Sequence, residues 1–244
     1  MTTLIVGATG ATGRLVVDQL LHAGEKVRII ARNIDKLPPQ LQKRDNLSII
    51  QGTIIDMSEK ERIKHVSGCD AIISCLGHNM SWKGIYGSPR KLVTTSIQKL
   101  IAAVEKRQSK ETLKLVLMNS TGVRNRDLKE PIPFAQHAVL GLLRLAVPPH
   151  LDNEKAADYL RTYQNKTYSS IEWVSVRPDT LLNHDKVSPY TLHPSPTRSA
   201  IFNSGQTNRI NVAHLMTELI TKQDLWDKWK GKMPVIYNTS LNIK

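Results

Sequence analysis

The chain has 244 residues, of which 40% are hydrophobic and 23% are charged, a balance typical of globular proteins that bury a substantial core. Its 34 Lys and Arg residues against 21 Asp and Glu residues give a net charge of +13, but the basic residues are scattered, which argues against a nucleic-acid partner and suits an anionic small molecule. No run approaches the roughly 20 apolar residues that span a bilayer, and no basic segment precedes the first apolar run, so we expect neither membrane insertion nor a signal peptide.

Apolar runs typical of strands alternate along the chain with amphipathic stretches typical of helices. We expect strands over residues 3–7, 26–31, 47–52, 70–76, 113–120, 171–177 and 233–238. We expect helices after the first strand, ending at Gly24, and near residues 34–43, 58–66, 89–107, 152–167 and 211–220. Continuous apolar strands that alternate with helices indicate a parallel sheet covered on both faces. The predicted fold class is therefore α/β, with a doubly wound parallel sheet of the Rossmann type.

The pattern changes after the sixth expected strand. Residues 183–208 are rich in Pro, Ser, Thr, His and Asn, a composition typical of loops. No repeat, low-complexity segment or linker divides the chain. We therefore expect one domain over residues 1–244, in which residues 183–244 contribute a small lobe on the substrate side.

The first expected strand runs directly into a turn with three glycines, Gly7, Gly10 and Gly13, in the stretch GATGATG. In a doubly wound sheet this turn lies where ligands bind, and the helix that follows offers unpaired N–H groups and partial positive charge to a pyrophosphate. We expect Gly7 to allow the turn, Gly10 to allow close approach of the ligand and Gly13 to allow tight packing of the helix. The predicted phosphate-binding residues are Gly7, Thr9, Gly10, Ala11, Thr12 and Gly13.

The GATGATG spacing resembles that of the atypical short-chain dehydrogenase/reductases, in particular the NmrA-like NAD(P)H-binding proteins and the biliverdin/flavin-reductase-like proteins. The resemblance extends over most of the chain. It includes the strand that ends in Ser120-Thr121-Gly122, the VRPDTL segment over 176–181 and the RINVAHLMTELI segment over 209–220. It implies a nicotinamide cofactor but says little about the substrate.

The residue that follows the second expected strand bears on which nicotinamide cofactor binds. NAD-binding members place an acidic residue roughly 20 positions past the glycines, and in this chain that count falls at Arg32-Asn33. The guanidinium of an arginine can donate two parallel hydrogen bonds to a phosphate, but it cannot accept a hydrogen bond from a ribose hydroxyl. Arg32 therefore favours the 2′-phosphate of NADP(H), with help from Arg14 and Lys36. Asp35 keeps the NAD alternative open.

Other cofactor contacts are expected at the ends of the third and fourth strands. Thr53 and Ile54 are predicted near the adenine, although members of the resembled family often have an aspartate where Thr53 stands. The ribose and nicotinamide are expected to lie against the residues that end the fourth strand, namely Ser74, Cys75, Leu76 and Gly77.

The usual short-chain reductases carry Tyr-x-x-x-Lys, in which the tyrosine donates a proton and the lysine lowers its pKa and binds the ribose. No such motif occurs in these 244 residues. The nearest match is LDNEK over 151–155, which keeps Lys155. This lysine either holds the ribose, acts as the acid itself, or is a solvated surface residue. One helical turn further on, Tyr159 is either a substitute donor or a packing residue.

Ser120 and Thr121 end the fifth strand, where the usual members place a catalytic serine or threonine. They are predicted either to bind a substrate carbonyl or to cap the turn. On the substrate side, we expect an aromatic lid from His78, Trp82 and Tyr86 in the 78–89 loop. Further candidates for the substrate pocket are His137 with the apolar run 138–147, and the polar residues Asn183, His184, Tyr190 and His193.

The cysteines and histidines show no metal motif. Cys69 and Cys75 form no CxxC pair, which is typical of a reduced, cytoplasmic protein without a disulfide framework. The eight histidines show no HxxxH or HExxH spacing, so we predict no metal.

Two functions follow from these features. The first is an NADPH-dependent reductase of a small planar acceptor such as a flavin, a quinone or a carbonyl compound. The second is a non-catalytic regulator of the NmrA-like type that senses NADP(H) and binds a protein partner. An epimerase of the same fold is disfavoured because it needs the missing Tyr-x-x-x-Lys. The helix near 89–107 fits either a homodimer contact or packing on the sheet.

Overall fold

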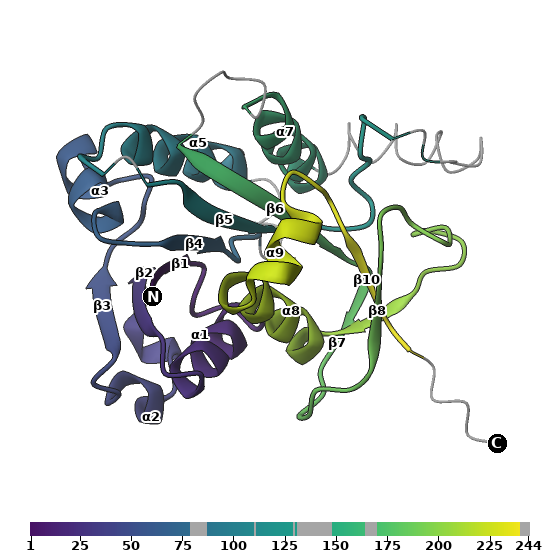
Figure 1. Cartoon of the computed structure of the whole chain (residues 1–244), viewed down its shortest axis with the longest axis horizontal. Helices are drawn as coiled ribbons and strands as arrows, with labels where there is room; N and C mark the ends of the chain where they lie inside the picture. Colours follow the sequence, from purple (N-terminus) through teal and green to yellow (C-terminus); the bar gives the residue numbers. More distant parts are fainter. Residues whose placement is uncertain (79–86, 110, 129, 131–147, 164–169, 240–244) are drawn as a thin grey trace.

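A computed structural model describes residues 1–78, 87–109, 111–128, 130, 148–163 and 170–239 (Figure 1). An eight-stranded sheet forms its centre, in the order β3-β2-β1-β4-β5-β6-β10-β8. These strands are β1 (Thr2–Val6), β2 (Lys26–Ala31), β3 (Leu47–Gln51), β4 (Ala71–Ser74), β5 (Leu113–Met118), β6 (Ile171–Pro178), β8 (Tyr190–His193) and β10 (Val235–Asn238). A separate parallel pair joins β7 (Thr180–Leu182) to β9 (Gln206–Asn208).

The sheet has the doubly wound arrangement that the sequence predicts. All neighbouring strands from β3 to β10 pair in parallel, and only β8 is antiparallel to its neighbour β10. The chain moves outward in one direction from β1 to β3 and then returns to place β4 on the other side of β1. The strand order therefore reverses between β1 and β4, which is where such sheets bind ligands at the carboxyl ends of their strands.

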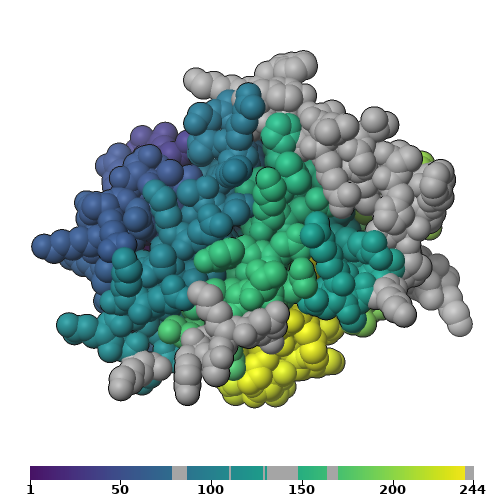
Figure 2. Space-filling model, turned by 90° about the horizontal axis from the view of Figure 1, so that it is seen from above, coloured from purple at the N-terminus to yellow at the C-terminus, as the bar shows by residue number. Residues whose placement is uncertain are grey.

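Helices cover both faces of the sheet, as Figure 1 shows. On one face α1 (Gly13–His22), α8 (Arg209–Thr221) and α9 (Gln223–Trp229) enclose one apolar cluster. On the other face α3 (Glu59–Val66), α5 (Leu92–Glu105) and α7 (Pro148–Tyr163) enclose a second cluster. Figure 2 looks down on this second face, where α7 lies beside α5. The central strands β1, β4, β5 and β6 are mostly buried between these layers, which explains their largely apolar sequences.

The structure differs from the sequence prediction in several places. The expected helix near 34–43 is a 3₁₀ turn (Ile34–Lys36) and the short α2 (Pro39–Gln42), because Pro38 and Pro39 interrupt it. The expected loop over 183–208 contains β8 and β9, and β7 forms where no strand was expected. The helix α9, which no pattern in the sequence analysis indicated, buries Trp226 and Trp229.

Arg177 joins the end of β6 to the surrounding segments. Its side chain is fully buried, donates to the carbonyl oxygens of Met233, Val123 and Pro194 at 2.8–3.0 Å, and lies 2.8 Å from a carboxylate oxygen of Glu130. A buried guanidinium is stable only when its donors are satisfied and its charge is paired. This residue therefore fixes the C-terminal part of the chain against the sheet.

Candidate cofactor and active site

Gly7 and Gly13 are required by the chain itself. Gly7 follows β1 with a φ of +78°, and a Cβ atom there would lie 2.5 Å from the backbone carbonyl carbon of Cys75. At Gly13 a Cβ atom would lie 2.1 Å from the carbonyl oxygen of Gly7. Both positions exclude any side chain, so β1, the end of β4 and the start of α1 can meet closely only through these glycines.

Gly10 has different surroundings. It is exposed, and among the described residues only the carbonyl oxygen of Gly7 lies near its ideal Cβ position, at 3.3 Å. The fold therefore needs a glycine here much less than at Gly7 or Gly13. A side chain at this position would instead point outward, into the space that a ligand at the start of α1 occupies.

The first turn of α1 presents bare backbone N–H groups to that space. Thr12 is the N-cap but its side chain makes no capping hydrogen bond, and the first turn has no acidic residue. Within the described part of the chain, no acceptor is found for the N–H groups of Ala11, Thr12 and Gly13. Thr9 is half-buried beside them. Unpaired N–H groups at a helix start favour an anionic ligand such as a pyrophosphate.

Arg32 is exposed directly after β2, at the same edge of the sheet. In the described residues it makes no hydrogen bond or ion pair. The side chain of Asn33 accepts from the backbone N–H of Asp35 at 2.9 Å and so starts the 3₁₀ turn. Arg14, Asp35 and Lys36 are also exposed. A guanidinium without a protein partner is available to a phosphate.

The residues predicted near the adenine are engaged elsewhere. The hydroxyl of Thr53 donates to a carboxylate oxygen of Asp56 at 2.6 Å and accepts from the N–H of the same residue at 3.1 Å. Ile54 is buried in the apolar cluster under α3 and α5. A contact of either residue with a ligand would therefore have to come from the backbone.

The residues after β4 border the glycine turn. Cys75 and Leu76 are half-buried, whereas Gly77 is exposed, and no atom of the described residues lies within 4 Å of its ideal Cβ position. Burial raises the pKa of the Cys75 thiol to about 12. This thiol therefore stays protonated near neutral pH and is no nucleophile.

Ser120 and Thr121 follow β5 and make different contacts. The hydroxyl of Ser120 accepts from the N–H of Gly122 at 3.0 Å, which caps a turn. The hydroxyl of Thr121 is hydrogen-bonded to the carboxylate of Asp179, next to the end of β6. Burial raises the pKa of Asp179, although hydrogen bonds from Gly205, Thr180 and Thr121 act in the opposite direction. Thr121 is thus a structural link, and Ser120 keeps a hydroxyl proton to donate.

Lys155 lies on the exposed side of α7. The buried positions of this helix are Pro149, Asp152, Glu154, Ala156, Ala157, Leu160 and Tyr163. The exposure of Lys155 gives no support to the predicted ribose contact. Tyr159 packs against the apolar cluster beneath α7, which supports its packing role.

His150 and Glu154 lie toward β5 instead, and sequence reasoning missed both. Atom Nε2 of His150 is 3.4 Å from Oε1 of Glu154, and the two side chains are 13% and 7% exposed. The ring of His150 borders Gly122, with Cε1 at 3.4 Å from the ideal Cβ position of that glycine. Their spacing of four residues was a usable signal, because it equals that of Tyr-x-x-x-Lys.

Asp152 anchors the first turns of α7. Its carboxylate, fully buried, accepts from the N–H groups of Val93 and Thr94 at 2.7 and 3.0 Å and from Nε2 of His78 at 2.9 Å. Burial alone would raise the pKa of Asp152, but the hydrogen bonds from His78, Thr94 and Val93 outweigh it and hold the pKa below its usual value. This carboxylate therefore fixes α7 to the start of α5 and to the segment after β4.

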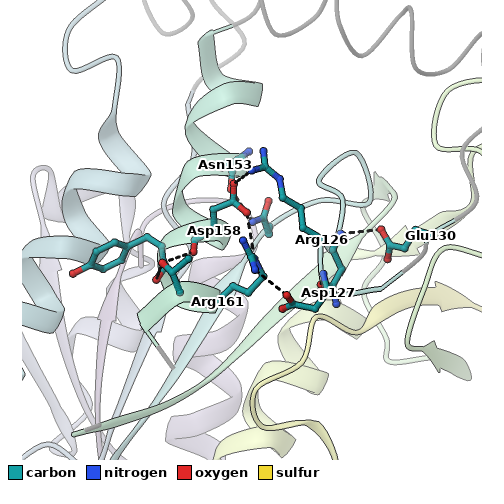
Figure 3. A network of polar contacts seen from close by, with 10 residues as sticks. Arg126, Asp127, Glu130, Asn153, Asp158 and Arg161 are labelled. Atoms are coloured by element: carbon teal, nitrogen blue, oxygen red, sulfur yellow. Dashed lines mark hydrogen bonds and ion pairs between the residues drawn. The ribbon is translucent and has the colours of Figure 1, made fainter. Parts of the chain in front are cut away.

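A second set of polar contacts holds the segment after β5 against α7 (Figure 3). Arg126 pairs with Asp158 at 2.9 Å, and Arg161 pairs with Asp127 at 2.8 Å. In addition, the side-chain amide of Asn119 donates to the carbonyl oxygen of Asn153 at 3.1 Å. These contacts therefore hold the segment after β5 along the length of α7.

The predicted substrate side is described only in part. Trp82, Tyr86, His137 and the run 138–147 lie outside the described residues. Asn183 and His184 are exposed, and His193 lies 3.0 Å from the hydroxyl of Thr191. Tyr190 is hydrogen-bonded to Nδ1 of His214 at 2.8 Å, and burial, with the nearby Glu218, raises its pKa to about 12.

In the segments that the structure describes, no group of three His, Cys, Asp or Glu side chains is placed to hold a metal ion. None of the helices in those segments is both long and apolar enough to cross a membrane.

Comparison with known proteins places this arrangement in context. An uncharacterized chloroplastic protein of Arabidopsis thaliana is 26% identical over 222 residues, which cover 90% of this chain and 72% of the relative. A short-chain dehydrogenase/reductase of Veillonella parvula, solved in complex with NADP, aligns with a TM-score of 0.69 and 14% sequence identity. The alignment covers 98% of this chain and 95% of the Veillonella chain. An anaerobilin reductase of Escherichia coli O157:H7 has a TM-score of 0.69 at 16% identity, with full coverage of both chains.

The two solved structures show that the fold is shared. Family assignment comes from a different comparison, in which the model of the NAD(P)H-binding family matches residues 7–223. This match begins at the first glycine of the turn and extends through α8. The chain belongs to the NAD(P)H-binding family.

Proposed function

We propose that this protein is an NADPH-dependent reductase of a small planar acceptor, such as a flavin, a quinone or a carbonyl compound. The observation that carries the proposal is the start of α1, where an exposed Gly10 adjoins three backbone N–H groups that have no acceptor in the described residues. This is the environment that a dinucleotide pyrophosphate needs. The cofactor, when bound, supplies the hydride, and the protein supplies position and exclusion of water.

The choice of NADPH over NADH rests on Arg32. Its guanidinium is exposed after β2 without a partner in the described residues, and its fork suits the two oxygens of a 2′-phosphate. Asp35, the competing residue, lies three positions further on in the 3₁₀ turn. The similarity to a structure solved with NADP supports this choice.

The acceptor class is supported by the absence of Tyr-x-x-x-Lys from the sequence. Flavins and quinones can take their proton from water, so the chemistry does not depend on that pair. The chain also shares its fold with a protein that is named as an anaerobilin reductase. Together these points favour hydride transfer over epimerisation.

The first experiment mixes the purified protein with NADPH and a panel of flavins, quinones and aldehydes and follows the loss of nicotinamide absorbance. We expect saturable oxidation with at least one acceptor. Binding of NADPH is measured separately by fluorescence. Protein that binds NADPH and oxidises it with none of these acceptors would contradict the reductase proposal.

The same assay tests Arg32. In Arg32→Asp the new carboxylate repels the 2′-phosphate and can accept from a ribose hydroxyl, so NADPH affinity should fall about 100-fold while NADH affinity changes less than about threefold. Lys26→Asp makes the same change of charge at the amino end of β2, where Lys26 is also exposed, and should leave both affinities unchanged. Equal losses for the two cofactors would remove the argument for the 2′-phosphate.

A second candidate function is an NADP(H)-sensing regulator that binds a protein partner, alone or as a homodimer. The exposed Lys155 favours it, because the residue predicted to hold the ribose in an enzyme is turned to solvent. Tight and selective binding of oxidised or reduced cofactor without turnover would support this function. Of the two, we favour the reductase because Ser120, just after β5, keeps a hydroxyl proton that can be donated to an acceptor.

A further inference from the structure

The order of the strands fixes where the two halves of a dinucleotide can lie. The glycine turn follows β1, Arg32 follows β2, and β4 lies on the other side of β1 from β2. A cofactor with its pyrophosphate at the start of α1 and its 2′-phosphate at Arg32 therefore extends its nicotinamide half over the end of β4. The residues there are Cys75, Leu76 and Gly77.

This segment is fastened at its start to the glycine turn. The N–H of Cys75 donates to the carbonyl oxygen of Val6 at 2.9 Å. The backbone then packs so closely on Gly7 that a Cβ atom at residue 7 would overlap the carbonyl group of Cys75 and the nitrogen of Leu76. The start of the segment is therefore held against the end of β1.

The other end of the segment is fastened by His78, whose side chain is only 5% exposed. Its atom Nε2 lies 2.9 Å from Oδ2 of Asp152 on α7. Burial raises the pKa of Asp152, but the hydrogen bonds that the carboxylate accepts outweigh burial and keep this pKa below its usual value. The carboxylate is therefore ionised near neutral pH and can only accept, so Nε2 donates a charge-assisted hydrogen bond.

Asp152 is itself held in place by α5. Its carboxylate accepts from the N–H groups of Val93 and Thr94 at 2.7 and 3.0 Å, and its carbonyl oxygen accepts from the hydroxyl of Thr94 at 2.9 Å. We call this set of bonds between Asp152, Val93 and Thr94 the α5–α7 joint. The acceptor of the His78 bond is part of this joint, so the bond fixes His78 relative to the helices that cover the sheet.

Gly77 lies between the two attachments and is exposed at the ligand edge of the sheet. Glycine has the widest choice of backbone conformations and loses the most entropy when it is ordered. A short segment that contains this residue keeps one shape only if it is held at both ends. Val6 and Gly7 hold one end, and His78 holds the other.

We propose that His78 is a positioning residue for the nicotinamide half of the cofactor, and that it acts through the backbone of residues 75–77. The inference rests on the proposed NADP(H) site and adds a coupling to it. Because one hydrogen bond connects the segment to the α5–α7 joint, binding of the nicotinamide half and ordering of the joint favour each other. The adenosine half, which lies toward Arg32, is independent of this bond.

Paired binding measurements separate the two halves of the cofactor. Adenosine 2′,5′-bisphosphate carries the adenosine and the 2′-phosphate of NADPH but no nicotinamide. In His78→Leu, which cannot donate to Asp152, the Kd for NADPH should rise about tenfold, the cost of ordering roughly one residue of backbone on binding, while the Kd for the bisphosphate stays within about twofold. His78→Gln, whose side-chain N–H reaches about as far as Nε2, should regain most of the affinity for NADPH.

Thr94→Val is the matched control. Valine has nearly the shape of threonine but cannot donate to the carbonyl oxygen of Asp152, so this variant weakens the α5–α7 joint and leaves the His78 bond in place. We expect a lower free energy of unfolding and unchanged Kd values for both ligands. His78→Asn, whose side chain is too short to reach Asp152, replaces His78→Leu if the leucine variant does not fold.

Hydrogen exchange tests the coupling in the wild-type protein. Saturating NADP⁺ should slow the exchange of the N–H groups of Val93 and Thr94, because these groups bind Asp152. Saturating bisphosphate should leave their exchange unchanged. Shielding by the ligand alone, without coupling, would slow exchange in residues 75–78 and not at Val93 and Thr94.

The outcomes distinguish this inference from the proposed function. A wild type that binds neither NADPH nor the bisphosphate would overturn the proposed cofactor site and the positioning role with it. A wild type that binds NADPH but reduces no acceptor would overturn the reductase and leave the positioning role standing. If His78→Leu binds NADPH as tightly as the wild type, or loses both ligands equally, the positioning role is wrong. It is also wrong if NADP⁺ slows exchange at Val93 and Thr94 no more than the bisphosphate does.

Discussion

The three glycines after β1 differ in what surrounds the position that a Cβ atom would take. At Gly13 that position is 2.1 Å from a backbone oxygen, whereas at Gly10 the nearest atom is 3.3 Å away and the residue is exposed. Two glycines of one motif therefore serve different purposes, since Gly13 closes the fold and Gly10 keeps a surface open. Substitution by alanine separates these purposes.

We expect Gly13→Ala to destabilise the protein by about 3 kcal/mol or more, because its methyl group overlaps the Gly7 carbonyl and the turn must move. Gly10→Ala should lower the free energy of unfolding by less than about 1 kcal/mol and yet weaken NADP(H) binding at least tenfold. Urea unfolding and a fluorescence titration measure the two effects. A Gly10→Ala variant that binds NADP(H) as tightly as the wild type would contradict the assignment of this surface.

At the scale of the secondary-structure element, α7 depends on Asp152. Its carboxylate satisfies two N–H groups at the start of α5, a helix whose N-cap, Lys91, makes no side-chain capping bond. It thus caps α5 from another helix. The hydrogen bonds it accepts also keep the pKa of Asp152 below its usual value, despite burial.

Asp152→Asn should cost about 2–3 kcal/mol, because an amide cannot accept all of these bonds and leaves buried donors unpaired. A carboxyl group whose pKa is lowered by folding stabilises the protein above its unfolded-state pKa, about 3.9, and loses that contribution as the pH falls through the folded value. The difference in unfolding free energy between wild type and variant should therefore be full above about pH 5 and shrink below about pH 4. Urea unfolding at several pH values measures it, and a pH-independent difference would contradict the role.

Elements with a local signal were predictable, and those that depend on distant partners were not. The strands β1 to β6 are continuous apolar runs, and the glycine turn is marked by GATGATG. The strand β8 is short and precedes Pro194, and it forms only because β10, over 40 residues later, pairs with it. The break before α2 was visible in Pro38-Pro39 but was outweighed by the surrounding helical pattern.

The positions of the candidate site residues show the same difference. Arg32 and Ser120 lie just after β2 and β5, where the sequence places them, because a strand end fixes where the following residues lie. The prediction for Lys155 came from a match to a helical motif. On a helix, successive side chains point about 100° apart around the axis. A shift of one residue therefore separates an exposed Lys155 from a buried Glu154.

At the scale of the whole molecule, Arg177 and Glu130 join the sheet to the segments around it. The guanidinium contacts carbonyl oxygens from three segments besides its ion pair with Glu130. Because these segments share one buried group, they should not unfold independently of the sheet. We expect a single unfolding transition.

Glu130→Gln should cost about 3 kcal/mol, since removal of one partner leaves a buried charge without its counterpart. Glu111→Gln, at an exposed position, is the control and should cost less than about 0.5 kcal/mol. In the double variant with Arg177→Met, the loss should be at least about 1 kcal/mol smaller than the sum of the single losses. Urea unfolding measures all four proteins, and additive losses would mean that the pair is not coupled.

The position of β10 has a consequence for synthesis of the chain on the ribosome. This strand is the last of the sheet in sequence and lies between β6 and β8. Strands β1 to β6 can pair with one another once residue 178 has been added, so the cofactor half can assemble while later residues are still being synthesised. In the described residues β8 pairs only with β10, so it has no partner strand until Val235–Asn238 have been added. The nascent chain can thus form its nucleotide-binding end well before the edge that contains β8 and β10.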